Sequence, residues 1–439
     1  MVMQVIATAE QSPRLKGLEE AMDAGDGQAL ETFWQEVAQQ GTPLVEPDPG
    51  DPGCSLVTFL WRAEDELENV VLFGNWSTFD LADLQMLRLG HTDCWYRTYR
   101  MPNELRASYW LAPDDSLVPL REMTSDEEFQ ERLDNFRPDP LNPRTLVFPG
   151  PGRAASVLAL PDPAPQPWIV PQPDIPTGEL QDHRLRSVIL DNERRVWTYL
   201  PPGYAPNQDS YRLLIVFDGA QYTSVVPTPV ILDTLLAADR IPPMVAIFVD
   251  NADGTDEERS AARSRELPCY PPFADFLAQE LIPWIRANYH VSAEPSSTIV
   301  AGSSFGGLAA AYAAFRYPEI FGNVLSQSGA FQWKPGHDPF QPDSGEESED
   351  EWLIREYAIG PLQDVRFYLD VGIFDSRTLP GERPGILLAN RHLRNVLRAK
   401  GYALHYAEFC GGHDYACWRG TLADGLLALE ERGGASDAT

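Results

Sequence analysis

The spacing of apolar residues divides the chain into stretches with different periods. Between residues 13 and 40, apolar side chains recur every three or four positions, which is typical of amphipathic helices. Residues 55–62, 69–74, 94–100 and 106–112 form short alternating segments separated by turn residues. Strands of this length and spacing predict a β-sandwich of roughly 100 residues.

After residue 180, strand-like runs alternate with helical periods. Strands are expected at 186–190, 195–200, 213–217, 244–249, 297–301, 366–371 and 403–409. Helices are expected at 272–288, 306–316, 386–400 and 417–431. This alternation predicts a doubly wound α/β sheet with helices on both faces.

Two proline-rich stretches separate these regions. The first covers residues 42–53, and the second runs from Pro138 to about Pro176. Proline at this density favours an extended, semi-rigid connection. We therefore divide the chain into a helix and β-sandwich unit (1–150), a linker (151–180) and an α/β domain (181–439).

Composition excludes several classes of partner. The chain has 439 residues, 43% of them hydrophobic, and a formal net charge of −31. So acidic a surface argues against nucleic acid and anionic membranes as partners, because both require a basic face. We read no signal peptide and no apolar run long enough to span a membrane. The five cysteines lack metal-ligand spacing, which is typical of free thiols in a reducing cytoplasm.

The segment with the clearest chemical meaning is Gly302-Ser-Ser-Phe-Gly306. It follows a β-branched run and precedes an alanine-rich helical period, so it is a G-x-S-x-G motif in strand–turn–helix context, the nucleophile elbow of α/β-hydrolases. The turn would expose the hydroxyl of Ser304 at a helix N-terminus, where backbone N–H groups can face a developing oxyanion. For the motif alone, a glycine-rich loop opening an ordinary helix is the alternative.

A serine attacks an ester at neutral pH only when a base lies within hydrogen-bond reach. His413, in Gly411-Gly-His-Asp414, is the candidate base, and Asp375, after the expected strand 366–371, is the candidate acid. Asp370, on the other side of Gly372, is the alternative acid. The order serine, aspartate, histidine is the one that the α/β-hydrolase fold requires.

Other residues are candidates for transition-state and substrate binding. The loop after the strand 213–217 supplies the second oxyanion donor in this fold, so we assign the backbone N–H groups of Ala220 and Phe305. Arg259, Arg263 and Arg265 cluster at a strand end, where α/β proteins bind ligands. Arg263 would neutralise an anionic substrate. Alternatively, the cluster pairs with Asp253, Asp256, Glu257 and Glu258. Trp76, Trp95 and Trp110 either line a binding face of the sandwich or pack in its core.

These motifs resemble those of the enterochelin (ferric enterobactin) esterases of the esterase-D type. The resemblance rests on Asp218-Gly-Ala-Gln221, on Arg263-Ser-Arg-Glu-Leu-Pro-Cys269, on the block 300–307 continuing to 325–329 and Trp333, and on Gly411-Gly-His-Asp-Tyr-Ala-Cys-Trp-Arg419. It covers about residues 140–435. Residues 57–62 and 139–143 are similar to the Ig-like N-terminal domain of that family.

The resemblance implies that Ser304 is the nucleophile and His413 the base, with Asp375 at a position where some relatives have glutamate. It places Arg263 and Trp333 in the substrate-binding region. The implied reaction is hydrolysis of the ester bonds of a tri-serine catecholate siderophore, usually iron-loaded, in the cytoplasm. Iron then belongs to the substrate, and no cofactor or protein-bound metal is expected. A general carboxylesterase or feruloyl-type esterase and a non-catalytic siderophore or carbohydrate binder are the alternatives, and the oligomeric state is left open.

Overall fold

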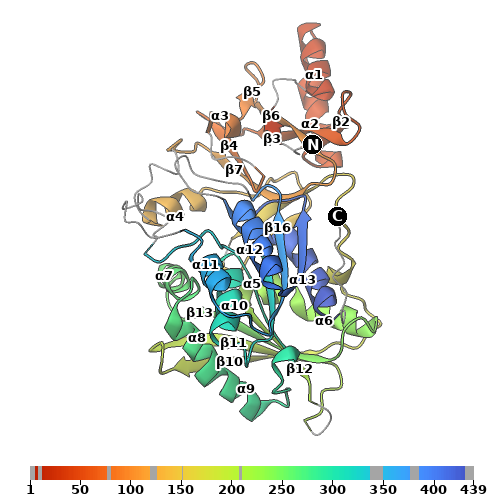
Figure 1. Cartoon of the computed structure of the whole chain (residues 1–439). Helices are drawn as coiled ribbons and strands as arrows, with labels where there is room; N and C mark the ends of the chain where they lie inside the picture. The colour runs from red at the N-terminus through yellow and green to blue at the C-terminus, as the bar shows by residue number, and fades with distance from the viewer. Residues whose placement is uncertain are drawn as a thin grey trace.

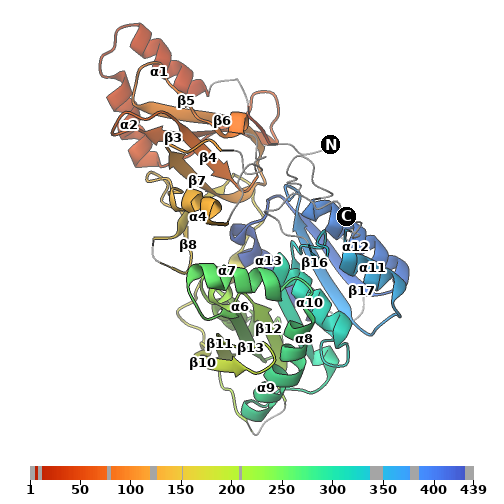
Figure 2. The same cartoon turned by 90° about the vertical axis from the view of Figure 1, so that its left-hand side faces the viewer.

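The chain forms a β-sandwich unit and an α/β domain that lie end to end (Figure 1, Figure 2). The computed structural model describes residues 5–7, 12–76, 81–118, 126–150, 152–206, 210–336, 350–375 and 385–430. The helical period near the N-terminus is confirmed as two helices, α1 (Pro13–Asp23) and α2 (Ala29–Gln40). Both pack one apolar face against the outer side of the sandwich, where Leu15, Phe33 and Trp34 are buried.

The sandwich consists of two antiparallel sheets. One has the strand order β1-β6-β3-β2, with β5 paired to β6, and the other has the order β4-β7-β9-β8. The strands are β1 (Ile6–Ala7), β2 (Leu44–Pro47), β3 (Cys54–Arg62), β4 (Val70–Gly74), β5 (Leu87–Arg88), β6 (Cys94–Pro102), β7 (Arg106–Pro113), β8 (Thr145–Val147) and β9 (Ala154–Ala159). Two short helices, α3 (Leu81–Leu84) and α4 (Asp126–Asp134), accompany them.

Aromatic side chains fill the space between the two sheets. Trp76 and Trp95 are 5% and 7% exposed and belong to this core, so core packing is the correct alternative for both. Trp110 is half-buried and its indole N–H donates to the carbonyl of Ala154. Because β9 pairs with β7 and β8, residues 154–159 are part of the sandwich, although we had assigned 151–180 to a linker.

The α/β domain is built on an eight-stranded sheet with the order β10-β11-β13-β12-β14-β15-β16-β17. The first two pairings are antiparallel and the remainder parallel. The strands are β10 (Glu179–Ser187), β11 (Asn192–Leu200), β12 (Arg212–Phe217), β13 (Met244–Ala252), β14 (Thr298–Ser303), β15 (Asn323–Gln327), β16 (Arg366–Gly372) and β17 (Ala403–Phe409). The predicted doubly wound sheet is confirmed. The sequence analysis missed β15 and expected a strand at 186–190, whereas β10 ends at Ser187 and residues 188–191 form a turn.

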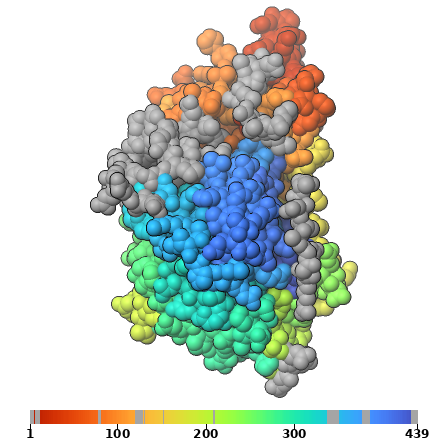
Figure 3. Space-filling model, in the orientation of Figure 1, coloured from red at the N-terminus to blue at the C-terminus, as the bar shows by residue number. Residues whose placement is uncertain are grey.

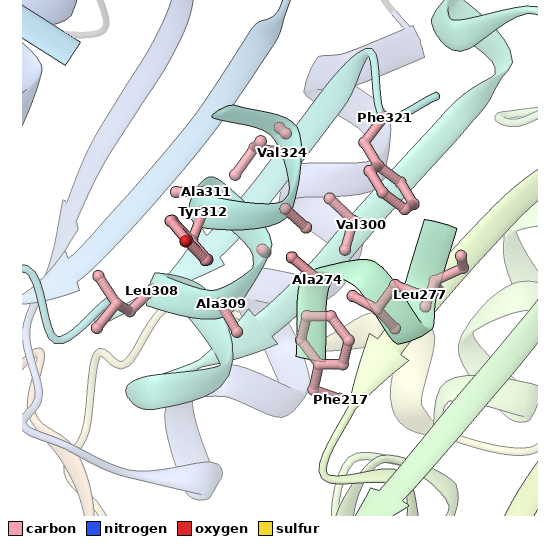
Figure 4. Close-up of a cluster of buried hydrophobic side chains, with 14 of the residues drawn as sticks. Phe217, Ala274, Leu277, Val300, Leu308, Ala309, Ala311, Tyr312, Phe321 and Val324 are labelled. Atoms are coloured by element: carbon pink, nitrogen blue, oxygen red, sulfur yellow. The ribbon is translucent and has the colours of Figure 1, made fainter. Parts of the chain in front are cut away.

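Helices cover both faces of this sheet. One face carries α8 (Pro271–Phe276), a π-helical segment (Leu277–Leu281), α9 (Ile282–Asn288), α10 (Phe305–Arg316), α11 (Trp352–Ile359) and α12 (Ile386–Lys400). The other carries α5 (Gly219–Ser224), α6 (Thr228–Ala237) and α13 (Tyr415–Glu430), while α7 (Asp256–Glu266) follows β13. Alanines on α10 favour a helix and let it approach the sheet closely, so that Leu308, Ala309 and Tyr312 pack on neighbouring strands and α8 (Figure 4).

The carboxyl ends of the parallel strands point toward the sandwich, as the arrow of β16 in Figure 1 shows. Loops that follow β12, β14, β16 and β17 therefore gather at one edge of the sheet, as is usual for ligand sites in this architecture. The C-terminal part of the α/β domain lies directly against the sandwich in the space-filling view (Figure 3). Within the described residues, no helix combines the length and apolarity needed to cross a membrane.

Candidate active site

The turn between β14 and α10 holds the backbone of Ser304 in an unfavourable conformation. Its φ and ψ are 56° and −123°, a region that residues other than glycine rarely adopt. A Cβ atom on Gly302 would lie 2.7 Å from the backbone of Gly306, so the turn is too tight for a side chain there. The Ser304 hydroxyl does not cap α10 and is partly exposed, which leaves its oxygen available.

Backbone hydrogen bonds hold this turn from neighbouring segments. The Ser304 N–H donates to the carbonyl of Gln327 at 3.0 Å, and the Ser304 carbonyl accepts from Leu308 and Ala330 at 3.1 and 3.0 Å. Gln327 ends β15, and its side-chain amide donates to Thr421 and to the carbonyl of Trp418. The strained turn is thus fixed to β15 and, through β15, to α13.

Asp375 and His413 lie together after adjacent strands. His413 Nδ1 is 3.1 Å from Asp375 Oδ1, and β16 and β17, which precede the two residues, are parallel neighbours. The Asp375 side chain is 2% exposed and that of His413 is 28% exposed. The rings of Trp418 and His413 are perpendicular with centroids 4.8 Å apart, and the indole N–H of Trp418 donates to Ser328 Oγ. The imidazole is therefore held by a carboxylate at one nitrogen and by an aromatic ring on its side.

Ser304 lies at the same edge of the sheet, at the end of β14, which β15 separates from β16. Among the described residues, the hydrogen bond of the imidazole goes to Asp375, and none joins Ser304 Oγ to His413. Catalytic hydrogen bonds are often long without substrate and tighten when it binds. The three candidate triad members thus come from the loops after β14, β16 and β17.

The alternative acid, Asp370, is placed differently. It lies inside β16, has no exposed surface, and both carboxylate oxygens lack a hydrogen-bond partner among the described residues. Burial raises the pKa of this carboxyl to about 8. Burial therefore favours the protonated form of Asp370, whereas the carboxylate of Asp375 faces the imidazole.

The candidate oxyanion donors lie in the first turns of two helices that follow adjacent strands and cover opposite faces of the sheet. Phe305 is the first residue of α10 and Ala220 the second of α5, so their N–H groups have no partner within the helix. The strands before them, β12 and β14, are parallel neighbours. A Cβ atom on Gly219 would lie 2.9 Å from the backbone of Phe248, which explains why this close approach needs glycine.

Arg263 makes a two-pronged ion pair beside the elbow. Its Nε and Nη2 atoms donate to the two carboxylate oxygens of Asp218 at 2.7 and 2.8 Å. Burial lowers the pKa of Arg263, but Asp218, together with Tyr415 and Tyr222, raises it above its usual value overall, so the guanidinium stays charged. It also lies 5.8 Å from the ring centroid of Phe305, and its side chain is 27% exposed.

The other two arginines of the cluster are paired as well. Arg259 bonds Asp250 at 2.8 Å and Arg265 bonds Glu266 at 2.9 Å. The ion-pair alternative is therefore correct in kind, but the partners differ from the acids that we expected. Asp218 and Asp250 are strand-end residues that the fold brings close to the cluster, whereas Glu266 is the residue that follows Arg265 in the chain.

Trp333 follows β15 and is half-buried. Its ring packs edge-to-face on Trp352 of α11, with centroids 6.2 Å apart. A role in binding substrate stays a prediction for this residue.

The site contains aromatic residues that the sequence analysis did not single out. Tyr415 packs on Trp418 at 4.8 Å and on Phe148 of the sandwich at 6.0 Å between centroids. Tyr415 and Trp418 lie within the Gly411–Arg419 motif, so the motif contained the signal. Phe148 is far away in the chain and offered none. Among the described residues, no three His, Cys, Asp or Glu side chains gather closely enough to hold a metal ion.

Both units of the chain match known protein families. Residues 187–429 match the family described as putative esterase, and residues 56–169 match the family described as enterochelin esterase, N-terminal. The Iron(III) enterobactin esterase of Dickeya dadantii is 33% identical over 424 residues, which cover 91% of this chain and 92% of that protein. The Iron(III) salmochelin esterase of Escherichia coli is 30% identical, over 95% of this chain and 97% of the relative.

Solved structures agree in fold over both units. The ferric enterobactin esterase of Salmonella typhimurium has a TM-score of 0.73 at 30% sequence identity, covering 91% of this chain and 98% of that chain. The enterobactin esterase of Shigella flexneri, crystallised in the presence of enterobactin, has a TM-score of 0.71 at 29% identity, with 91% and 97% covered. With its esterase domain, its N-terminal domain and relatives along nearly its whole length, this chain belongs to the enterochelin esterase family of carboxylic ester hydrolases.

Proposed function

We propose that this protein is a serine esterase that cleaves the ester bonds of a ferric catecholate siderophore built on a tri-serine lactone, such as enterobactin. The observation that carries the proposal is the Asp375–His413 pair at the sheet edge of the Ser304 elbow, in a chain whose full-length relatives are named enterobactin and salmochelin esterases. We place the reaction in the cytoplasm, where cleaving the lactone would weaken the chelate and release iron.

Each step of the reaction has a residue suited to it. Ser304 Oγ attacks the ester carbonyl while His413 Nε2 accepts its proton, because Asp375 holds Nδ1–H and so fixes the tautomer. The backbone N–H groups of Ala220 and Phe305 stabilise the oxyanion. The leaving alcohol takes the proton from His413, and a water molecule activated by the same imidazole then releases the acyl group from Ser304.

The surroundings of the elbow suit an aromatic, anionic substrate. Arg263 supplies a charged guanidinium next to Phe305, and Tyr415 and Phe148 present aromatic rings from both units. Trp333 completes the proposed substrate-binding set. In a chain of net charge −31, such a local cation would concentrate a ferric catecholate anion that the rest of the surface repels. Iron enters and leaves as part of the substrate.

One observation favours a second candidate, a general carboxylesterase. The positive charge of Arg263 is already balanced by Asp218, which reduces the attraction for an anion.

Product analysis separates the two candidates. Purified protein is incubated with ferric and iron-free enterobactin, and the products are followed by mass spectrometry. Linear and monomeric dihydroxybenzoylserine support the proposal, whereas an intact lactone alongside rapid turnover of p-nitrophenyl esters supports the second candidate.

Replacing the nucleophile should abolish turnover. We expect Ser304→Ala to lose several orders of magnitude in kcat with little change in fold, because loss of a triad member has an effect of that size in other serine hydrolases. Ser303→Ala is the matched control, since Ser303 is fully buried beside it. If Ser304→Ala retained a tenth of wild-type activity while Ser303→Ala lost it, the nucleophile would be Ser303.

The two carboxylates of β16 and its loop should respond differently to the same substitution. Asp375→Asn would favour the wrong tautomer of His413 and should lower kcat by about 10²- to 10⁴-fold. Asp370→Asn replaces a carboxyl whose protonated form is favoured by burial with a group of similar shape, so kcat should change little. Steady-state kinetics that showed the reverse pattern would make Asp370 the catalytic acid.

Asp370 should also make stability depend on pH. The pKa of this carboxyl is 3.8 in an unfolded chain and about 8 in the folded protein. Between these pH values the folded state therefore binds more protons than the unfolded state. Its contribution to the free energy of unfolding therefore falls as the pH rises from about 4 to 8. Urea unfolding at pH 5 and pH 8 should show Asp370→Asn gaining stability relative to wild type at the higher pH. An equal difference at both pH values would contradict a protonated Asp370.

Arg263 should matter more for a charged substrate than for a neutral one. We expect Arg263→Ala to raise KM for the ferric siderophore by about tenfold or more, given the usual size of a charge-assisted contact, and to alter KM for a short neutral ester far less. Arg265→Ala, on the same helix but more exposed, is the control. Equal losses on both substrates would mean that Arg263 serves only to hold Asp218.

A further inference from the structure

A side chain of the sandwich is bonded to the residue that follows the catalytic histidine. Asp414 accepts hydrogen bonds from both the backbone N–H and the hydroxyl of Ser108, a residue of β7 that is 306 positions away in the chain. The hydroxyl contact measures 3.0 Å, and Ser108 and Asp414 are 1% and 2% exposed. Asp414 also accepts from the N–H of Ala416 at the start of α13. This buried carboxylate thus ties the His413 loop to the sandwich and to its own helix.

The sandwich touches the same loop at further points. A Cβ atom on Gly412 would lie 1.6 Å from the carbonyl oxygen of Asn75, so the two backbones are in direct contact beside His413. The Arg106 N–H donates to the carbonyl of Cys410 at 3.3 Å, and Cys417 Sγ contacts the Arg106 carbonyl at 3.2 Å. Strand β7 and its neighbour therefore border the histidine loop before and after the imidazole.

The loop that carries Asp375 is held by the same unit. Phe374 is 8% exposed and belongs to the hydrophobic core of the sandwich, with Ile373 and Cys410 packed against it. The N–H groups of Ile373 and Phe374 donate to the carbonyls of Phe409 and Gly411, which joins the acid loop to the histidine loop. Two residues of the α/β domain that directly precede the acid are thus packed in the other unit.

The helix that presents the oxyanion donor Ala220 also reaches the sandwich. Val225, at the C-terminal end of α5, and Ala416 form a buried cluster with Leu146 and Val157 of the small β8–β9 hairpin. Three catalytic elements, namely the acid loop, the histidine loop and the α5 helix, therefore pack on one side against strands of the N-terminal unit.

We propose that the β-sandwich is a working part of the catalytic centre, and that Ser108 and Asp414 are positioning residues that set the imidazole of His413 against Asp375. Loops at a sheet edge are among the least stable parts of a domain, and a misplacement of about 1 Å can cost 10²-fold in rate. The buried carboxylate of Asp414, which accepts two hydrogen bonds from Ser108, lies next to the histidine and limits such movement. The proposal rests on the triad assigned above, but not on the identity of the siderophore.

The test uses full-length variants and a neutral substrate. Ser108→Ala removes the hydroxyl hydrogen bond to Asp414, keeps the one from the Ser108 backbone N–H, and leaves the site itself untouched. Ser156→Ala is the matched control. Ser156 lies in the adjacent strand β9 and is fully buried, and its hydroxyl accepts a hydrogen bond from the backbone N–H of Asp139 within the sandwich. For each protein we would measure thermal unfolding, the fraction of sites titrated by a fluorophosphonate, and kcat and KM for p-nitrophenyl acetate well below the unfolding temperature.

Ser108→Ala should lower kcat per titrated site about tenfold or more while KM changes less than twofold, and Ser156→Ala should keep wild-type kcat even if it unfolds at a lower temperature. Asp414→Asn, which turns a donor toward the Ser108 N–H, should lower kcat further. The proposal is overturned if Ser108→Ala and Asp414→Asn match Ser156→Ala in kcat, since the contacts would then serve stability alone. It is also overturned if they change only KM. Because the ester is simple, either result leaves the siderophore proposal to its own test.

Discussion

The backbone of Ser304 is the constraint on which the rest of the site depends. A non-glycine residue at φ 56° and ψ −123° is unfavourable on its own, and it persists because the surrounding structure holds it. The sheet supplies that support: Gln327 and Ala330 bond both sides of the turn, and Gly302 and Gly306 allow the chain to close on itself. As a result, the Ser304 hydroxyl does not cap the helix that follows it and stays partly exposed.

The other candidate catalytic groups reach this point because parallel strands end at one edge of the sheet. Adjacent strands β16 and β17 bring Asp375 and His413 together, although 38 positions separate them. The sandwich packs against these loops at Asp414 and Phe374, and against the end of α5 at Val225. The site is therefore bounded by two units that the chain connects by a proline-rich segment. Its charge is balanced locally, since Arg263 is paired with Asp218.

Much of this could be predicted from sequence where the signal is local. The elbow, the helix at 386–400 and the Ser, Asp, His order are written in short motifs or clear periods. Strand β15 escaped because Asn323, Ser326 and Gln327 are polar yet fully buried, with the two amides bonded to neighbouring segments, so no apolar pattern marks it. Strand β9 was assigned to the linker because prolines lie on both sides of it in the sequence.

The remaining features depend on contacts between distant parts of the chain. The partner of Arg263 is 45 positions away at the end of another strand, and charge clustering along the sequence pointed to nearer acids. Ser108 is an unremarkable serine in a strand until the fold places it on Asp414. Such pairs are set by tertiary packing, which neither composition nor periodicity carries.

The central claim is that Ser304 is a nucleophile activated by His413, and covalent trapping tests it most directly. Wild-type protein and a His413→Ala variant are treated with a fluorophosphonate, and the modified residue is located by peptide mass spectrometry with the rate of labelling followed in time. We predict a single adduct on Ser304 in the wild type and labelling slower by orders of magnitude in the variant. An adduct on Ser303, or equal labelling rates in the two proteins, would contradict the account.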